Sequence, residues 1–436
     1  MCSYGHTMCS CKLSRLHDII NVMKAHIVSL GCPKNLADTE LLMGQLAGDG
    51  YTFTDDPAEA ELILVNTCAF IQSATDEAIA TIRELAKYKV PGTRNQVPGK
   101  CKYLIAAGCL PQRYKNEAPK LLPEVDAFIG TPQRFHSYKA ARVKATPPWF
   151  AYVKIAEGCS NRCTYCAVPG IRGPFRARPL NDILKEVALL AGAGVKEVIF
   201  VAQDTTAYPH LPKLLRLTAK IPGVRWIRLM YAHPAHISDE LLKTIAAEPK
   251  IVKYLDLPIQ HCNGKILKRM HRRYSRRSLE NIIAKIRRLI PNIALRTSVI
   301  VGFPGEDEAG FQELLRFVRQ VKFERLGAFT YQREKGTPAY RMRGQLPERI
   351  KKRRLDRLMR AQALIAQRLG HKMIGRTIEI LVEKAVRGGF TGRSSMDAPE
   401  IDGSVIVSAR RSKTPGEFVQ VRVTSARTYD LLGRMT

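Results

Sequence analysis

Three short apolar runs in the first third of the chain are each followed closely by a cysteine. The pairs of run and cysteine are Ala25–Leu30 with Cys32, Leu62–Val65 with Cys68, and Tyr103–Ala107 with Cys109. Between the runs lie segments with helical periodicity, Asp38–Ala47 and Ala74–Lys87. Because strands alternate with helices, this part of the chain predicts βαβ units and an N-terminal domain with an open parallel sheet.

The three cysteines are expected to converge. In open α/β sheets, ligands bind beyond the carboxyl ends of the strands. Cys32, Cys68 and Cys109 should therefore meet in one crevice and hold a cluster. The alternative to a cluster site is that the three thiols are buried and inert, since free cysteine is among the most buried residue types. The occurrence of a cysteine at the same topological position three times argues against this alternative. Cys101 instead precedes its strand, and we interpret it as structural.

The cysteines of this 436-residue chain number eleven, and they indicate a reducing cytoplasm. A disulfide framework is not expected, because the number of cysteines is odd, the chain is long and its start lacks an apolar export segment. Residues 1–22 do not resemble the sequence that follows them, and an apolar strand pattern begins directly after Met23. We therefore interpret Met23 as the natural start. We interpret Cys2, Cys9 and Cys11 as parts of a non-native or disordered extension without function.

A second group of cysteines is closely spaced. Cys159, Cys163 and Cys166 form a C-x3-C-x2-C arrangement directly after the predicted strand Ala151–Ala156. Three thiolates in one loop can hold three irons of a four-iron cluster and leave the fourth open to S-adenosylmethionine, a source of 5′-deoxyadenosyl radicals. A zinc site would need a fourth ligand at ribbon-like spacing. A redox pair of Cys163 and Cys166 would leave Cys159 without a role.

The rhythm of strand and helix repeats six times from residue 151 onward. The predicted strands are Ala151–Ala156, Glu197–Ala202, Trp226–Tyr231, Val252–Leu257, Ala294–Val301 and Arg325–Tyr331. Six units fall short of the eight that close a full barrel. The sequence therefore predicts a central partial (β/α) barrel, whose open side would suit a macromolecular substrate.

Polar residues follow the ends of these strands, on the face that carries the active site in barrels. They are Gln203, Asp204, His233, Gln260, His261 and Gly302–Glu306. Gln203, Gly302 and Glu306 are candidates for binding S-adenosylmethionine. His233 and His236 have the residue type of metal ligands, but a helix cap or loop packing is the preferred interpretation.

After residue 346 the alternation of strand and helix ends, and the sequence pattern changes to one long helix followed by short β runs. Residues 347–370 predict one helix, with Lys351–Arg354 on a solvated basic face, and a further basic run lies at Lys268–Arg277. Five short β runs follow Thr377 and predict a small OB-like β-barrel, suited to RNA or to a protein partner. The formal net charge of +31 indicates a polyanionic neighbourhood such as RNA, the ribosome or a membrane surface. No apolar run approaches the roughly 20 residues that span a bilayer.

Taken in order, these parts resemble the radical S-adenosylmethionine methylthiotransferases. Several strings are similar to the RimO type, which acts on a ribosomal protein, rather than to the tRNA-modifying MiaB type. They are Ser29–Asn35, Tyr152–Cys166, Gln203–Tyr208, Tyr254–His261, Ala398–Gly403 and Tyr429–Gly433. The implied division is a methylthiotransferase domain at 23–140, a radical barrel at 145–346, a linker helix at 347–371 and a TRAM-like β-barrel at 372–436.

The resemblance also implies cofactors and site residues. Cys159, Cys163 and Cys166 would hold the S-adenosylmethionine cluster, a 4Fe–4S centre. Cys32, Cys68 and Cys109 would hold a second 4Fe–4S cluster with one iron open for exogenous sulfur. The expected activity is methylthiolation of the β-carbon of an aspartate in small-subunit ribosomal protein S-twelve.

The resemblance implies a cytoplasmic, monomeric enzyme that meets no membrane. Its expected partners are S-twelve, alone or in the assembling small subunit, a reductase such as flavodoxin or ferredoxin, and a sulfur donor. Two alternatives stay open: the same chemistry on a tRNA adenosine, and a non-catalytic metal-containing protein that binds RNA.

Overall fold

The computed structural model describes residues 24–90, 99–132 and 135–436. The predicted extension at 1–22 lies outside these residues. The chain divides into two compact units. The first comprises residues up to Ala145 together with Ala167–Pro174, and the second comprises Thr146–Cys166 and Phe175–Thr436.

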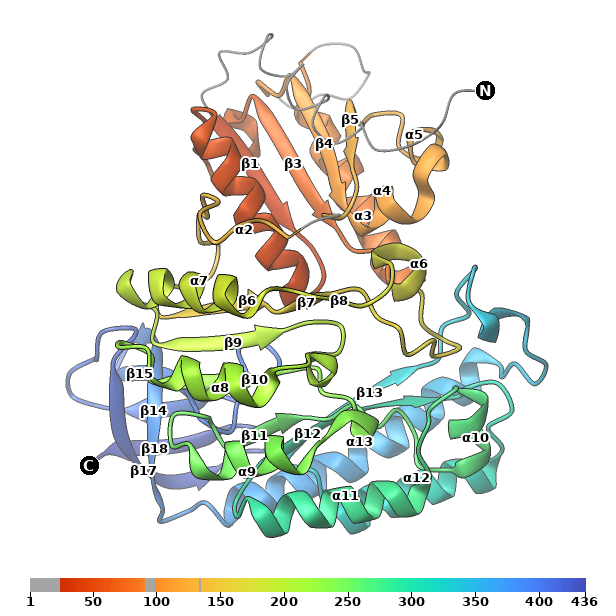
Figure 1. The fold of residues 1–436 in the computed structure, drawn as a ribbon, viewed down its shortest axis with the longest axis vertical. Coiled ribbons are helices and arrows are strands. Elements are labelled where there is room, and N and C mark those ends of the chain that lie inside the picture. The colour runs from red at the N-terminus through yellow and green to blue at the C-terminus, as the bar shows by residue number, and fades with distance from the viewer. Residues whose placement is uncertain (1–23, 91–98, 133–134) are drawn as a thin grey trace. The chain divides into compact units, whose positions relative to one another are not determined.

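The first unit is built on an open five-stranded sheet in the order β2-β1-β3-β4-β5, in which every pair is parallel (Figure 1). Its strands are β1 Lys24–Ser29, β2 Thr52–Phe53, β3 Leu62–Thr67, β4 Tyr103–Gly108 and β5 Ala127–Ile129. Its helices are α2 Pro33–Gly48, α3 Gln72–Leu85, α4 Cys109–Tyr114, α5 Ala118–Leu121 and α6 Val168–Arg172. The prediction of an open parallel sheet is confirmed.

Both faces of this sheet are covered, because alternate side chains of each strand point to opposite sides. One face gathers Ala25, Leu62, Leu64, Ile105 and Ala107 with Leu46 of α2. The other gathers Ile63, Val65, Leu104 and Ala106 with Ala78 and Ile82 of α3. Strands buried on both faces are continuously apolar, which is why these short runs stand out in the sequence.

Helix α2 begins five residues before the predicted start at Asp38. Pro33 occupies its first turn, where the missing N–H of proline costs no hydrogen bond. The side chains that its first turns bury include Asn35, Asp38 and Glu40. Asn35, in the part that the prediction missed, is polar although it is buried, so the apolar periodicity that marks a helix is not visible there.

The second unit contains the six parallel strands of the partial barrel. They form two groups, β10-β9-β6 and β11-β12-β13, and a parallel bridge between Ile227 and Ile251 joins the groups. The strands are β6 Phe150–Lys154, β9 Glu197–Val201, β10 Trp226–Leu229, β11 Tyr254–Asp256, β12 Ala294–Val301 and β13 Arg325–Thr330. Two short strands, β7 Ala156–Glu157 and β8 Arg176–Ala177, pair antiparallel beside them. All six predicted strands are present.

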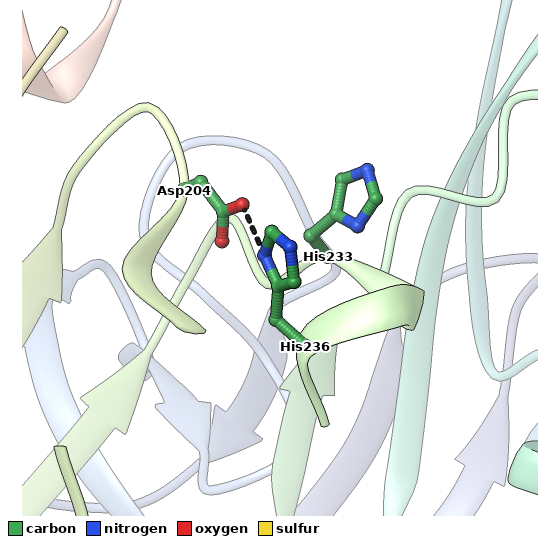
Figure 2. Close-up of side chains that lie close together, drawn as sticks. All are labelled: Asp204, His233 and His236. Carbon is green, nitrogen blue, oxygen red and sulfur yellow. Dashed lines mark hydrogen bonds and ion pairs between the residues drawn. The ribbon is translucent and has the colours of Figure 1, made fainter. Parts of the chain in front are cut away.

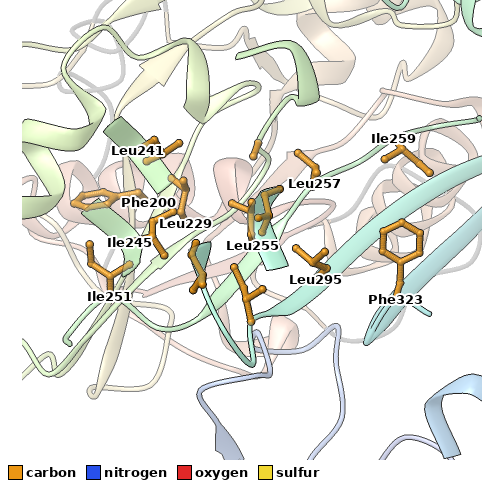
Figure 3. Close-up of a cluster of buried hydrophobic side chains, with 14 of the residues drawn as sticks. Phe200, Leu229, Leu241, Ile245, Ile251, Leu255, Leu257, Ile259, Leu295 and Phe323 are labelled. Carbon is orange, nitrogen blue, oxygen red and sulfur yellow. The ribbon is translucent and has the colours of Figure 1, made fainter. Parts of the chain in front are cut away.

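Helices alternate with these strands along the chain. They are α7 Leu180–Gly192, α8 Leu211–Ala219, α9 Asp239–Ala247, α10 Gly264–Arg269, α11 Arg276–Leu289 and α12 Glu308–Val321. Figure 3 shows the core that strands and helices share, with Phe200, Leu229 and Leu255 from strands and Leu241 and Ile245 from α9. This core fixes the strand ends on which the polar residues sit.

The linker helix α13 spans Glu348–His371 and buries Leu358 and Ile365 in the same core. The prediction that Lys351–Arg354 is solvated is wrong for its two end residues. Lys351 and Arg354 are buried, and they are tied respectively to the Tyr331 carbonyl and to Glu306. Their spacing of three residues places both on the inner face of the helix.

The C-terminal segment forms a closed five-stranded barrel in the order β14-β15-β16-β18-β17. Its strands are β14 Thr377–Val386, β15 Gly389–Ser394, β16 Val405–Ser408, β17 Phe418–Ala426 and β18 Leu431–Met435. Its interior is filled mainly by valines and isoleucine around Phe390. The predicted OB-like barrel is confirmed.

A buried charge network attaches this barrel to the partial barrel. Glu197 of β9 is fully buried and accepts hydrogen bonds from Arg228 of β10 and Arg393 of β15, each at 2.7 Å. Arg228 also donates to the carbonyl of Ser395 at 3.0 Å. The two barrels therefore share one polar core within the second unit.

In the described part of the chain, no helix is both long and apolar enough to cross a membrane.

Candidate functional site

Three cysteines of the first unit lie just past the carboxyl ends of adjacent strands. Cys32 caps α2 after β1, Cys68 follows β3 directly, and Cys109 opens α4 after β4. Gly31, the residue before Cys32, packs against Cys68, and Sγ of Cys109 donates to Oδ1 of Asn35 in the first turn after Cys32, at 3.8 Å. The structure thus brings together the residues that the sequence predicted to converge.

Close packing at this edge depends on glycine. Gly31 has a φ of +93°, and a Cβ added there would lie 2.6 Å from the Cβ of Cys68 and 2.9 Å from its Sγ. Gly108 has a φ of +88°, and its added Cβ would lie 2.2 Å from Oδ1 of Asn66. Both positions require a residue without a side chain, because the backbone is left-handed and the space is filled.

Arg172 and Asn35 organise the polar side of the three thiols. Arg172 donates from Nη2 to Oδ1 of Asn35 at 2.6 Å and to Sγ of Cys109 at 3.5 Å. Its Nη1 pairs with Asp38 at 3.0 Å. Asn35 donates to the carbonyls of Leu30 and Thr67 and thereby holds the loops after β1 and β3 together. These residues were missed at the sequence level, although Asn35 stands three residues after Cys32, on the same side of the first turn.

The thiols of this group differ in acidity. Burial raises the pKa of Cys32, but the charges of Lys34 and Arg172 and two backbone N–H groups outweigh it, and the net pKa is lowered. Burial raises the pKa of Cys68 to about 11, and it also raises the pKa of Cys109. Cys32 is therefore the thiol of this group that most readily becomes the thiolate that metals bind.

In the second unit, Cys159, Cys163 and Cys166 lie in a loop that follows β7. The backbone of Thr164 is fixed on both sides: its N–H donates to the Met270 carbonyl at 3.1 Å, and its carbonyl accepts from Ala339 at 2.8 Å. The Thr164 hydroxyl also donates to the Arg269 carbonyl at 2.8 Å. The loop is thus held from outside, by segments distant in sequence.

Two further side chains, Asp204 and His271, contact this loop. Asn161 donates to Oδ2 of Asp204 at 2.7 Å, past the end of β9. His271 bonds the carbonyl of Arg162 at 3.1 Å. Arg162, Tyr231 and Gln260 all have positive φ values, a conformation that costs free energy in residues other than glycine and that concentrates at functional sites.

Among the described residues, Asp204, His233 and His236 are the one group of three potential ligands close enough to bind a single metal ion. Their ligand atoms lie within 4.8 Å of one another. Figure 2 shows the bond of 2.8 Å between Asp204 and Nδ1 of His236, with the ring of His233 alongside. His233 Nδ1 accepts from the backbone of Ala235, at the start of the short helix Pro234–His236. The predicted role of His233 as a helix cap is confirmed.

Burial and the nearby charge of Arg272 lower the pKa of His233 to about 3. This imidazole is therefore neutral at physiological pH. Asp204 is held ionised, because bonds from His236 and Thr206 outweigh the effect of burial and lower its pKa. Hydrogen bonds thus fix these polar side chains next to the cysteine loop, which Asn161 joins to Asp204.

The predicted cofactor contacts fall into two kinds. Gln203 donates to Oε1 of Glu157 at 2.7 Å, and its own Oε1 is buried without a hydrogen-bond partner, so one acceptor remains available. Glu306 is instead fully engaged in the fold, with bonds from Gly302 N–H and from Arg354. Glu157, two residues before Cys159, was missed at the sequence level.

Three family models match successive, non-overlapping parts of the chain. They are described as the Radical SAM superfamily over residues 153–318, Uncharacterized protein family UPF0004 over 24–130, and the TRAM domain over 374–436. Among solved structures, the radical S-adenosylmethionine methyltransferase TsrM from Kitasatospora setae matches with a TM-score of 0.51 at 14% identity, over 72% of this chain and 76% of that one. This likeness supports the fold.

Curated relatives match nearly the whole chain. The ribosomal protein uS12 methylthiotransferase RimO of Geobacter sulfurreducens is 44% identical over 94% of this chain and 98% of that protein. The protein of the same name from Acetivibrio thermocellus is also 44% identical, over the same shares of both chains. With this similarity and all three domains present, the chain belongs to the RimO family of radical S-adenosylmethionine methylthiotransferases.

Proposed function

We propose that this protein methylthiolates the β-carbon of an aspartate in ribosomal protein uS12, the small-subunit S-twelve protein, using S-adenosylmethionine and two 4Fe–4S clusters. The observation that carries the proposal is identity of 44% over 94% of the chain to proteins named for this reaction. The two separate cysteine triads are consistent with it, because sulfur insertion and radical generation need different open irons.

Cys159, Cys163 and Cys166 are the proposed ligands of the cluster that binds S-adenosylmethionine. Their fit rests on the donor set: three thiols in one loop that distant segments hold in place. When bound, such a cluster supplies the electron that cleaves S-adenosylmethionine to a carbon radical. The loop contacts through Thr164 and Asn161 keep the three sulfurs together, so that little reorganisation is needed on binding.

Cys32, Cys68 and Cys109 are the proposed ligands of the second cluster. Cys32 contributes the most acidic of the three thiols, and Arg172 donates to Cys109. Asn35 fixes the loops that carry Cys32 and Cys68 relative to each other. These residues together can hold a group with one open iron, at which exogenous sulfur binds.

Gln203 is the proposed direct contact for S-adenosylmethionine. Its unpartnered buried Oε1 can accept a hydrogen bond from an amino or hydroxyl group of the cofactor. Gly302 and Glu306 shape the neighbouring turn: Gly302 has a φ of +74°, and its N–H donates to Glu306 at 2.8 Å. Contact of Gly302 or Glu306 with the cofactor stays a prediction.

The proposed reaction needs partners from outside the chain. A low-potential donor such as flavodoxin or ferredoxin would supply electrons, and a separate donor would supply sulfur. Because uS12 is a ribosomal protein, the reaction would take place in the cytoplasm, on the free protein or on the assembling small subunit.

The test is the intact mass of uS12 from cells with and without this gene, measured together with methylthioadenosine in tRNA. Loss of one methylthio group from uS12 alone supports the proposal. Loss from tRNA alone would transfer the same chemistry to the MiaB-type alternative. A strain carrying the Cys163→Ala chain is the matched control, because it makes the full-length protein without one proposed ligand.

A further inference from the structure

Arg272 is a buried cation next to a proposed cluster ligand. It lies in the segment after α10, and only 8% of its surface is exposed. Its Nη1 donates to Sγ of Cys163 at 3.4 Å. At the sequence level it was one member of the basic run Lys268–Arg277, whose neighbours Arg273 and Arg277 are indeed exposed.

The guanidinium is fixed by three different acceptors. Besides the Cys163 sulfur, Nη2 donates to the carbonyl of Pro258 at 2.7 Å, and Nε donates to the hydroxyl of Tyr274 at 2.6 Å. Tyr274 in turn donates to the carbonyl of Ile259 at 2.8 Å. The planar fork of arginine is therefore held in one orientation, with one arm aimed at Cys163.

Arg272 has no carboxylate partner among the described residues. None of their ion pairs includes it, whereas the buried Arg228, Arg354 and Arg393 each pair with glutamate. A buried charge without a counter-ion is costly, so a fold that keeps one needs an anion close by. Of its three acceptors, the Cys163 sulfur is the one that becomes negatively charged when it binds metal, because metals bind the thiolate. The Pro258 carbonyl is neutral, and so is the Tyr274 hydroxyl, which keeps its proton to donate to Ile259.

We infer that Arg272 is a positioning residue whose charged hydrogen bond to Cys163 raises the reduction potential of the cluster held by Cys159, Cys163 and Cys166. The inference rests on the proposed function, since it assumes that these cysteines hold that cluster. The step concerned is the entry of one electron from a low-potential flavin or ferredoxin donor. No bond forms or breaks in it, and no proton moves.

The direction of the effect follows from charge. Reduction adds one negative charge next to Cys163, and a fixed cation at hydrogen-bond distance stabilises the more negative state. Hydrogen bonds to the sulfurs are among the main determinants of the potentials of iron–sulfur clusters. Because Arg272 is buried and not neutralised by a carboxylate, solvent and counter-ions screen its charge little.

The first unit offers a contrasting arginine. Arg172 also donates to a cysteine sulfur, that of Cys109, but its Nη1 pairs with the Asp38 carboxylate at 3.0 Å. The carboxylate offsets the charge that Arg172 presents to Cys109. The net electrostatic effect on the neighbouring sulfur should therefore be larger at Arg272 than at Arg172.

The experiment is a redox titration of the full chain, loaded anaerobically with iron and sulfide and followed by electron paramagnetic resonance. The signal that changes on addition of S-adenosylmethionine identifies the relevant cluster. Arg272→Gln should lower the ratio of reduced to oxidised cluster about tenfold at fixed potential, which is about 59 mV for a one-electron couple. Arg272→Lys keeps the charge but not the fork, and it should shift the potential less.

Two controls separate this effect from a general loss of charge. Arg273→Gln removes the same charge from the exposed adjacent residue and should leave the potential of this cluster unchanged. Arg172→Gln should also leave the signal that responds to S-adenosylmethionine unchanged, because its sulfur contact is to Cys109.

An unchanged potential in Arg272 variants that retain their full iron content would overturn the inference. So would loss of this cluster from both the Gln and the Lys variants, because Arg272 would then serve assembly instead. Failure of the proposed ligand assignment looks different: Cys163→Ala would retain all of its iron and its response to S-adenosylmethionine.

Discussion

Glu197→Gln should destabilise the second unit by several kilocalories per mole. Glu197 is fully buried between Arg228 and Arg393, which are 0% and 2% exposed, and it accepts one hydrogen bond of 2.7 Å from each. The amide of glutamine carries no charge and turns a donor toward one of the two guanidiniums. Breaking a buried ion pair by removing one partner costs about 3–5 kcal/mol, because the remaining charge is left uncompensated. Here that charge is the one on Arg228, since Arg393 also pairs with Glu383.

The expected loss can be read from thermal unfolding of the purified protein under anaerobic conditions. At about 2 °C per kcal/mol for a unit of this size, the Tm should fall by roughly 6–10 °C. Glu379→Gln is the matched control, since Glu379 also joins the terminal barrel to the partial barrel, through Arg225 at 2.7 Å, but the pair is 33% and 51% exposed. An exposed pair contributes about 0–1 kcal/mol, so this variant should move the Tm by no more than about 2 °C.

Equal shifts in the two variants would refute the reasoning, because they would mean that burial does not amplify the charge network. Acid provides a second check on the sign. Burial raises the pKa of Glu197, but Arg393 and Arg228 outweigh burial and lower the net pKa. The stabilisation is therefore complete above the unfolded value of about 4.3 and is lost as the pH falls through the lower folded value, so the two chains should converge in strong acid.

Three further predictions concern the candidate sites. Cys163→Ala should abolish formation of 5′-deoxyadenosine from S-adenosylmethionine, while Cys68→Ala should spare much of it and stop sulfur insertion; a methylthio product from the Cys68 variant would disprove the second-cluster assignment. Gly31→Ala should push Cys68 aside, because the added Cβ lies 2.9 Å from its sulfur, and should cost the chain about half of its iron. Gly50 also has a left-handed backbone, but no atom lies near its missing Cβ, so Gly50→Ala should keep all the iron. Equal losses of iron in the two variants would mean that backbone strain, not the contact with Cys68, causes the loss. Below pH 6.5, His233 should lower the free energy of unfolding by up to about 1.4 kcal/mol per pH unit, because its side chain takes up a proton only in the unfolded chain. Urea titrations at pH 7 and 5 should therefore show a smaller fall in His233→Gln than in the unsubstituted chain, and an identical fall would contradict this.

The strands and the cysteines could be predicted because their signals are local. A strand buried on both faces is a continuous apolar run, and a cysteine just past its end is visible in the sequence without any knowledge of packing. The six strands of the partial barrel and the five of the terminal barrel also appear in the sequence as short apolar or β-rich runs, although the strands of the terminal barrel are buried on one face only. The placement of Cys32, Cys68 and Cys109 at one sheet edge then follows from parallel topology alone.

The polar interior could not be predicted, because a charged residue carries no sign of its burial. Lys351, Arg354 and Arg272 stand in basic runs, where the usual interpretation is a solvated surface. Each is buried against an acceptor that lies far away in the sequence, among others the Tyr331 carbonyl, Glu306 and the Cys163 sulfur respectively. Such partners are brought near only by the tertiary fold, and periodicity within one helix does not encode them.

The buried charges also bear on what the excess of positive charge means. Among the described residues, buried basic and acidic side chains are nearly equal in number: Lys154, Arg172, Arg178, Arg228, Arg272, Lys351, Arg354 and Arg393 against Asp38, Glu40, Glu157, Glu197, Asp204, Asp256, Glu306, Glu334 and Asp397. Because the interior is close to neutral, it does not account for the formal charge of +31. The excess is carried by residues outside this interior set, where it can act on the surroundings through solvent. A basic exterior favours encounter with a polyanion, which is the environment that a ribosomal substrate provides.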